Sequence, residues 1–213
     1  MNCIICKSDC KKDGKQKNGV QKYKCKVCGK YQQKKYKKQP KDRDVIVLLK
    51  EGCGIRSMAR ILKSSPGTIS RRILSISKTI NSPLIKMAKE YEVDEMCTYI
   101  GNKKDRYWIA YAIQKDTKTV VGFRIGKRTN KTLRPLTQTL ILSQAIKIYT
   151  DKLMNYRSLI PQEIHSVKQY SINHIERMNL TLRTHLKRLN RRTICYSKNL
   201  MMLSACLKIY FWA

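Results

Sequence analysis

The sequence predicts a multidomain protein of mixed α+β or α/β class, with a small metal-stapled module, a three-helix module and a mixed sheet with helices. Three observations predict this organisation. Two Cys-x-x-Cys pairs stand in a lysine-rich N-terminal segment, apolar residues at helical spacing follow, and strand-like runs then alternate with helical patterns. We therefore place the domains at residues 1–41, 42–86 and 87–213.

The composition points to a polyanionic partner. Lys and Arg number 46 against 14 Asp and Glu in 213 residues, which gives a formal net charge of +32. Such a charge repels itself in a compact chain, and nucleic acid is the usual partner that offsets it. An anionic membrane surface is the alternative, but the sequence has no run of 18 apolar residues and no signal-peptide pattern. We expect a cytoplasmic, nucleoid-associated protein with no membrane partner.

The N-terminal segment needs a stabilising element other than a hydrophobic core, because residues 1–41 contain fourteen lysines and few aliphatic side chains. Two Cys-x-x-Cys pairs, eighteen residues apart, offer four thiolates: Cys3, Cys6, Cys25 and Cys28. This spacing is typical of a zinc ribbon, and four thiolates make the Zn²⁺ structural because they leave no open position for chemistry. Reduced, unligated thiols are the alternative. Cys10 is a spare thiol that we expect to pack or to stay free.

Residues 42–86 follow a Lys- and Gln-rich linker over residues 30–41 and carry three apolar stripes at helical spacing. Gly52 separates the first two helices, and Ser65 with Pro66 forms a typical start for the third. A tight turn between the second and third helices predicts a helix-turn-helix. The alternative is a basic three-helix bundle that binds nothing specifically.

The helix-turn-helix offers candidate contacts to DNA. The third helix of this motif reads bases in the major groove, where arginine is the commonest reader of guanine, and the preceding helix meets phosphates. The absence of acids between Glu51 and Glu90 favours DNA as the ligand. The predicted DNA-binding residues of this domain are Arg56, Arg60, Thr68, Ser70, Arg71 and Arg72.

The remaining sequence alternates between strand-like and helical patterns. Strand-like runs over 91–100, 107–113 and 119–125 predict an antiparallel meander. Beyond it we expect helices over 132–144, 172–190 and 200–212 and short strands over 145–150 and 164–167.

Acids are scarce in so basic a chain, so their positions carry information. Asp94 lies in the first strand, Asp151 follows the strand over 145–150, and Glu176 opens the helix over 172–190. Phosphoryl transfer with two metal ions needs carboxylates from several elements that converge on ions about 3.5–4 Å apart. In the alternative reading none of the three is catalytic: Asp94 is an edge residue, Asp151 a turn residue, and Glu176 an acid that the helix macrodipole favours. The helix face of Glu176 also carries candidate DNA-binding residues, namely Asn179, Arg183 and Lys187.

These acids stand in segments that resemble the insertion-sequence-one family of DDE transposases. Residues 93–104 (VDEMCTYIGNKK) resemble the first catalytic block of that family, and residues 107–112 (YWIAYA) resemble the strand after it. The run Tyr149-Thr150-Asp151 resembles the second block, and residues 175–198 are similar to the family signature over their whole length. The cysteine pairs and residues 54–62 (GIRSMARIL) resemble the DNA-binding part of the family. The resemblance therefore covers nearly the whole chain.

The resemblance implies an RNase H-like catalytic domain in which Asp94, Asp151 and Glu176 are catalytic and hold Mg²⁺ through hard oxygen ligands. Twenty-four residues separate Asp151 from Glu176, as the family pattern requires. It further implies a DNA transposase that binds terminal inverted repeats, cleaves a strand at the element end and joins the freed 3′-hydroxyl to target DNA. The implied partners are the element ends, the target DNA and further copies of the chain on DNA.

Two further readings stay open. The first is a non-catalytic, degraded or regulatory DNA-binding protein with a zinc ribbon and a helix-turn-helix. The second is a metal-dependent nuclease of the same fold without strand transfer. Departures from the family pattern motivate the first reading: Lys152-Leu153 stands where a Gly-Trp pair is usual, and Cys97 stands where Trp is usual.

Overall fold

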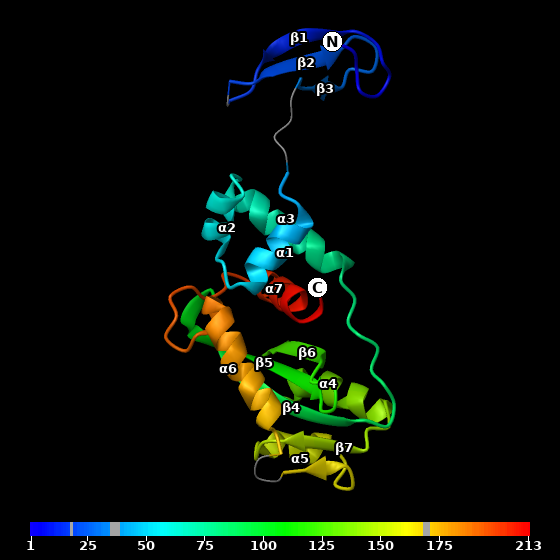
Figure 1. Cartoon of the computed structure of the whole chain (residues 1–213), viewed down its shortest axis with the longest axis vertical. Coiled ribbons are helices and arrows are strands. Elements are labelled where there is room, and N and C mark those ends of the chain that lie inside the picture. The colour runs from blue at the N-terminus through cyan, green and yellow to red at the C-terminus, as the bar shows by residue number, and fades with distance from the viewer. Residues whose placement is uncertain (18, 35–38, 168–170) are drawn as a thin grey trace. The chain divides into compact units, whose positions relative to one another are not determined.

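The chain forms two compact units in the computed structural model, Met1–Gln39 and Pro40–Ala213 (Figure 1). The structure describes residues 1–17, 19–34, 39–167 and 171–213, so the predicted linker over 30–41 lies partly outside the described residues. None of the helices in these ranges combines the length and the apolarity that a bilayer crossing requires.

The first unit is a three-stranded antiparallel sheet. Its strands are β1 (Cys10–Lys15), β2 (Gln21–Cys25) and β3 (Tyr31–Gln32), in the order β1-β2-β3. Among its described residues, the buried hydrophobic side chains are Cys3, Tyr23 and Cys25. So small a core stabilises a fold only weakly, which leaves the cysteines as the stabilising element.

The second unit begins with three helices, α1 (Asp42–Lys50), α2 (Ile55–Ile61) and α3 (Pro66–Thr79). They lie where the apolar stripes predict them. Ser65 Oγ accepts a hydrogen bond from the backbone N–H of Thr68 at 3.1 Å, and Pro66 stands in the first turn of α3. The cap therefore satisfies one of the N–H groups that the start of a helix leaves without a partner.

A five-stranded mixed sheet follows. Its strands, in the order β6-β5-β4-β7-β8, are β4 (Glu90–Ile100), β5 (Asn102–Gln114), β6 (Val120–Gly126), β7 (Lys147–Thr150) and β8 (His165–Ser166). The strands β4, β5 and β6 pair antiparallel, whereas β7 pairs parallel to β4 and β8 pairs parallel to β7. The predicted mixed sheet and its opening meander are confirmed.

Helices cover both faces of the sheet. On one face, Ala110 and Ala112 of β5 pack with α4 (Asn130–Leu142) and α5 (Met154–Leu159). On the other face, Ile109 and Tyr111 pack with α6 (Asn173–His185) and α7 (Leu200–Trp212). This alternation follows from the two-residue period of a strand. Figure 1 shows α6 lying across β4 and β5.

The prediction of one continuous helix over 172–190 is wrong at its C-terminal end. The helix α6 ends at His185, Leu186 adopts an extended conformation (φ −99°, ψ 92°), and a single 3₁₀ turn over Lys187–Leu189 follows. Leu186 and Leu189 are both buried. The break lets these two side chains enter the core, so tertiary packing overrides the helical spacing of the sequence.

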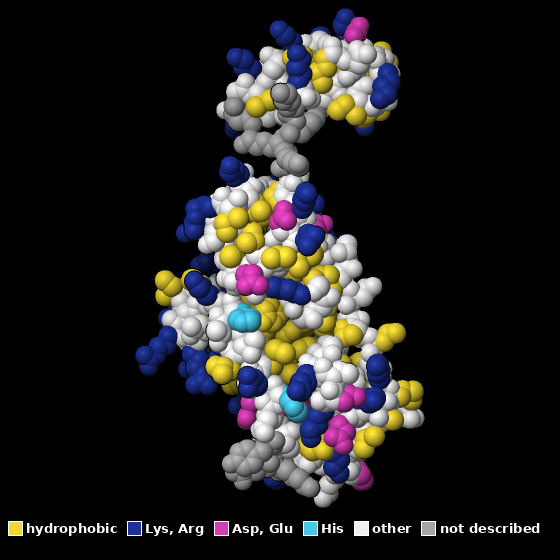
Figure 2. Space-filling model, viewed as in Figure 1, with side chains coloured by type: hydrophobic (Ala, Val, Ile, Leu, Met, Phe, Trp, Pro, Cys, Tyr) yellow, Lys and Arg dark blue, Asp and Glu magenta, His cyan; other side chains and the backbone are white. Residues whose placement is uncertain are grey.

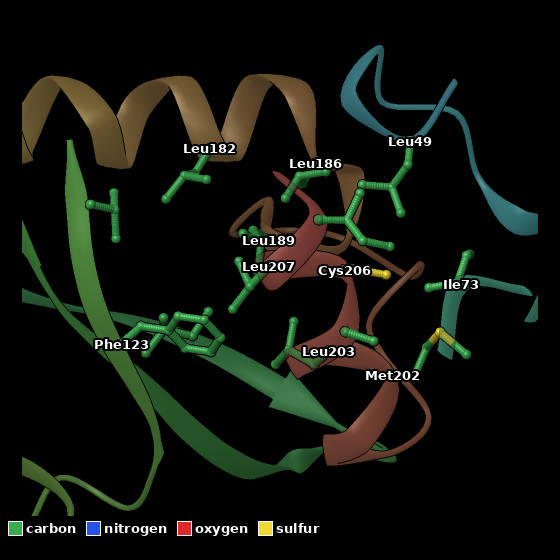
Figure 3. Close-up of a cluster of buried hydrophobic side chains, with 14 of the residues drawn as sticks. Leu49, Ile73, Phe123, Leu182, Leu186, Leu189, Met202, Leu203, Cys206 and Leu207 are labelled. Carbon is green, nitrogen blue, oxygen red and sulfur yellow. The ribbon is translucent and has the colours of Figure 1, made fainter. Parts of the chain in front are cut away.

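The C-terminal helix α7 is mostly apolar, and six of its thirteen residues are buried. It packs against α1 and α3 on one side and against β6 on the other. Figure 3 shows Leu49 of α1, Ile73 of α3 and Phe123 of β6 in one cluster with side chains of α7. The three-helix part and the sheet thus share a core, and the boundary predicted at 86–87 falls in the segment that connects α3 with β4.

Candidate active site and metal-binding clusters

The four predicted zinc ligands meet in space. The Sγ atoms of Cys3 and Cys28 lie 3.6 Å apart, and those of Cys6 and Cys25 lie 3.3 Å apart. One ligand atom from each of the four lies within 4.8 Å of the others. A zinc ion with Zn–S bonds of about 2.3 Å needs tetrahedral sulfur separations of about 3.8 Å. The donor set and its spacing therefore fit Zn²⁺, while Cys10 stays outside the group and accepts a hydrogen bond from Gln32 Nε2 at 2.8 Å.

The charges of these thiols also favour a bound cation. A hydrogen bond from the backbone of Ser8 lowers the pKa of Cys6 to about 6. At Cys28, a backbone hydrogen bond from Lys30 lowers the pKa, but the side chain of Cys25 and burial outweigh it and raise the pKa to about 12. Thiolates this close repel one another, and a bound cation would offset that repulsion.

A second cluster lies at the carboxyl end of β7, next to the middle of β4. In the parallel pairing of these strands Val93 lies opposite Thr150, so the residues that follow them, Asp94 and Asp151, are neighbours. Carboxylate oxygens of Asp94, Glu95 and Asp151 all lie within 4.8 Å of one another. Three hard oxygen donors at this spacing fit a divalent cation such as Mg²⁺.

The carboxylate of Asp94 is held on both oxygens. Its Oδ1 accepts a hydrogen bond from the backbone N–H of Glu95 and its Oδ2 accepts one from Asn179 Nδ2, both at 2.7 Å. The Oδ1 of Asn179 in turn accepts from the hydroxyl of Tyr111 at 2.8 Å. Burial, together with the charges of Glu95 and Asp151, raises the pKa of Asp94 to about 6. Asn179, a predicted DNA contact, thus lies against Asp94.

Glu95 is a site residue that sequence reasoning missed. Its side chain has no exposed surface, and its Oε2 accepts a hydrogen bond from the hydroxyl of Tyr156 at 2.7 Å. Arg128 donates to Oε1 through Nε at 2.8 Å, and its Nη2 lies 3.8 Å from Asp151 Oδ2. The Arg128 guanidinium also stacks 4.3 Å from the centre of the Trp108 ring. Burial raises the pKa of Glu95, whereas the hydrogen bonds from Tyr156 and Arg128 oppose this rise.

Glu176, the third predicted catalytic acid, lies on the exposed surface of α6 in its first turn. Within the described residues, the carboxylate group defined by the 4.8 Å spacing contains Asp94 and Asp151 but not Glu176. Asn179 follows Glu176 by three residues, which places both on one helix face. Asn179 contacts Asp94, so the first turns of α6 lie beside β4.

A basic hollow adjoins this face. It has a volume of about 610 Å³ and is lined by Leu180, Arg183, Thr184, Lys187, Asn190 and Arg191. The Nε atom of Arg183 is buried without a hydrogen-bond partner among the described residues. Burial and the charge of Arg191 lower the pKa of Arg183. Figure 2 shows Lys and Arg side chains gathered beside the C-terminal end of α6, where a phosphate would be attracted.

The predicted DNA-binding side chains of α2 and α3 differ in whether they are exposed and in whether they already contact another residue. Arg56 and Arg60 of α2 are exposed and line a hollow of about 380 Å³. Arg71 of α3 is exposed, whereas Arg72 forms an ion pair with Asp42 at 2.5 Å. Thr68 Oγ1 lies 2.8 Å from Ser65 Oγ, and Ser70 Oγ donates to the carbonyl of Pro66 at 2.9 Å.

We expect Asp94→Asn to raise the free energy of unfolding by about 1–3 kcal/mol at pH 7.5 without Mg²⁺. The pKa of Asp94 is about 6 in the folded chain against an ordinary value of 3.8, so the folded state binds the proton more tightly. Asp94 therefore stabilises the fold below pH 3.8, and this contribution is lost as the pH rises through 6. Urea unfolding at several pH values measures the difference, which should vanish near pH 4. A variant that is no more stable than wild type at pH 7.5 would contradict the burial of a charged carboxylate.

A family model described as IS1 transposase matches residues 88–211. The iso-IS1n protein InsB of Shigella dysenteriae is 35% identical over 113 residues, which are 53% of this chain and 86% of that protein. The IS1 protein InsB of Shigella flexneri is 35% identical over 108 residues, which are 51% of this chain and 82% of that protein. The matched region contains the whole acidic cluster and α6.

Two solved structures are similar at a lower level. The HTLV-2 integrase catalytic core domain, in complex with magnesium, matches 60% of this chain and 86% of its own at 18% identity, with a TM-score of 0.37. The simian T-cell lymphotropic virus intasome in complex with a PP2A subunit matches 76% of this chain and 66% of its own at 14% identity, with a TM-score of 0.38.

Proposed function

The chain belongs to the IS1 transposase family, and we propose that this DNA transposase cleaves and joins DNA at a carboxylate site formed by Asp94, Asp151 and Glu176. The observation that carries this assignment is the parallel pairing of β4 with β7, which sets Asp94 beside Asp151. The helix α6 adds support, because its face with Glu176 is bound to Asp94 through Asn179. With Glu176 turned toward this pair, carboxylates from three different elements would hold the ions that phosphoryl transfer requires.

The architecture around the site supports a more specific domain assignment. We infer an RNase H-like domain around the sheet, because three antiparallel strands are followed by two parallel strands on the other side of β4. The four thiols at tetrahedral spacing support a zinc ribbon in Met1–Gln39. The short connection between α2 and the capped start of α3 supports a helix-turn-helix.

The carboxylates of Asp94, Asp151 and Glu176 would hold Mg²⁺, whose preferred ligands are hard oxygen atoms. Divalent ions bound there would stabilise the charge on the attacking and leaving oxygens of the phosphodiester. Asn179 keeps the Asp94 carboxylate oriented through the hydrogen bond on its Oδ2. The four cysteines would hold a structural Zn²⁺.

Basic side chains would hold the DNA around this site. Arg183 and Lys187 line the hollow next to α6, where they would bind phosphates near the cleaved bond. The exposed arginines of α2 and α3 would hold the element end through its backbone and base edges. Because transposition joins two element ends to one target, we infer that several copies of the chain assemble on DNA.

Incubation of the protein with a duplex that carries the terminal repeats of its element tests this function. With Mg²⁺ we expect a nick at the element end, followed by joining of the 3′-hydroxyl to target DNA, and a duplex with scrambled ends serves as the control. Nicking without joining would favour the nuclease reading. Binding without nicking, at any Mg²⁺ concentration, would favour the non-catalytic DNA-binding protein.

A further inference from the structure

Glu92 is a charged side chain with no exposed surface in β4. Its Oε1 lies 2.6 Å from His174 Nδ1, and its Oε2 accepts a hydrogen bond from the backbone N–H of Ile175 at 2.9 Å. A buried carboxylate is unfavourable unless such bonds replace its water. Both partners belong to the first turn of α6, so the carboxylate links the central strand to this helix.

The N-cap residue of α6 forms no side-chain cap. This residue is Ile172, which offers no side-chain acceptor, although the first N–H groups of a helix need partners. Glu92 accepts one of these N–H groups from a distance of 83 residues in the sequence. A negative charge at this end also interacts favourably with the helix dipole. The strand therefore supplies an acceptor that the N-cap residue Ile172 does not offer.

A second link between the same elements lies one step further along both. Asn179 of α6 donates a hydrogen bond to Asp94 of β4. Asn179 follows Ile175 by four residues, and Asp94 follows Glu92 by two residues. Four helical residues rise about 6.0 Å and two strand residues span about 6.6 Å, so the two links have matching spacing. Together they fix the helix both in its position along the strand and in its rotation.

We propose that Glu92 is a positioning residue, which anchors the start of α6 and thereby sets Glu176 toward Asp94 and Asp151. Glu176 is the residue directly after Ile175, whose N–H Glu92 accepts. A shift of the helix start would move Glu176 without removing any proposed metal ligand. The inference rests on the proposed catalytic role of Glu176, but the anchoring itself is measurable without catalysis.

Hydrogen exchange tests the anchoring directly. Glu92→Met removes both acceptors at similar length and should speed exchange of the Ile175 amide, while amides of α3 keep their protection. Glu92→Gln keeps an acceptor for Ile175 and should stay close to wild type. Glu90→Met is the matched control, because Glu90 lies on the same face of β4 and contacts Tyr149 instead of α6. Unchanged protection of Ile175 in Glu92→Met would overturn the proposal.

Single-turnover cleavage of end DNA separates positioning from a general loss of structure. We expect Glu92→Met to lower kcat about 10- to 100-fold with KM for DNA unchanged, as loss of an orienting residue around a metal site does. Glu92→Gln should keep most of the wild-type kcat. His174→Ala leaves Glu92 and Ile175 in place, so its kcat should fall less than that of Glu92→Met. Parallel losses in KM and kcat, or a Gln variant as slow as Met, would overturn the positioning role. If wild type does not cleave, the proposed function fails, and the exchange experiment still decides whether Glu92 anchors α6.

Discussion

Asp151→Asn is expected to lower the rate of DNA cleavage on the order of 10⁴-fold and to leave binding of the element ends intact. The substitution replaces a carboxylate oxygen with an amide nitrogen that does not bind a cation, next to Asp94. The local turn should survive, because the remaining oxygen can accept the backbone N–H of Leu153, which Asp151 Oδ1 accepts at 3.0 Å. Single-turnover cleavage and a gel-shift titration with end DNA measure the two effects separately.

Asp105→Asn is the matched control for this substitution. Asp105 is an exposed carboxylate of β5 whose Oδ2 accepts a hydrogen bond from Asn102 Nδ2 at 2.8 Å, outside the acidic cluster. The Asp105→Asn variant should cleave DNA at the wild-type rate. Retained cleavage in Asp151→Asn would show that the carboxylate at the end of β7 takes no part in the chemistry.

Cys25→Ser is expected to remove the bound zinc and to unfold the unit Met1–Gln39. Structural zinc contributes about 10–16 kcal/mol of apparent binding free energy, far more than so small a core supplies. The unit Pro40–Ala213 should keep its own unfolding transition, because its core is separate. Binding of the element ends should weaken, since the unfolded unit no longer presents its lysines on a defined surface. Zinc content and thermal unfolding followed by circular dichroism check these outcomes.

Cys10→Ser provides the control for the zinc site. The Cys10 thiol lies outside the group of four and interacts with Gln32, so this variant should keep one zinc per chain. Burial raises the pKa of Cys10, which disfavours the thiolate that zinc needs. An unchanged zinc content in Cys25→Ser, or a loss of zinc in Cys10→Ser, would contradict the assignment of the four ligands.

Local signals in the sequence predict part of this site and not the rest. The meeting of the four cysteines was predictable because each Cys-x-x-Cys turn brings two thiols together within four residues. Asp151 was predictable because it ends a strand and because acids are rare in this chain. The contact between Asp94 and Asp151 depends on the register of β4 and β7. This register follows from the crossover through α4, and the sequence of neither strand predicts it.

Glu95 and Glu92 were missed for different physical reasons. Neighbouring residues of a strand point to opposite faces, so the alternation rule places Glu95 away from Asp94, although their oxygens come within 4.8 Å. Glu92 accepts a hydrogen bond from a helix start far away in the sequence, and Ile172 at that start does not indicate which side chain supplies the acceptor. The break after His185 was missed because the burial of Leu186 and Leu189 is decided by the tertiary core.

Cleavage of the backbone by radicals from bound iron tests most directly whether three acids share one cation site. Fe²⁺ takes the place of Mg²⁺ at oxygen ligands and, with ascorbate and peroxide, cuts the chain near its ligands. We expect cuts in three segments, around Asp94 in β4, after β7 at Asp151 and in the first turn of α6 at Glu176, all suppressed by excess Mg²⁺. Cuts that spare the α6 segment, or that excess Mg²⁺ does not suppress, would contradict a site formed by these three carboxylates.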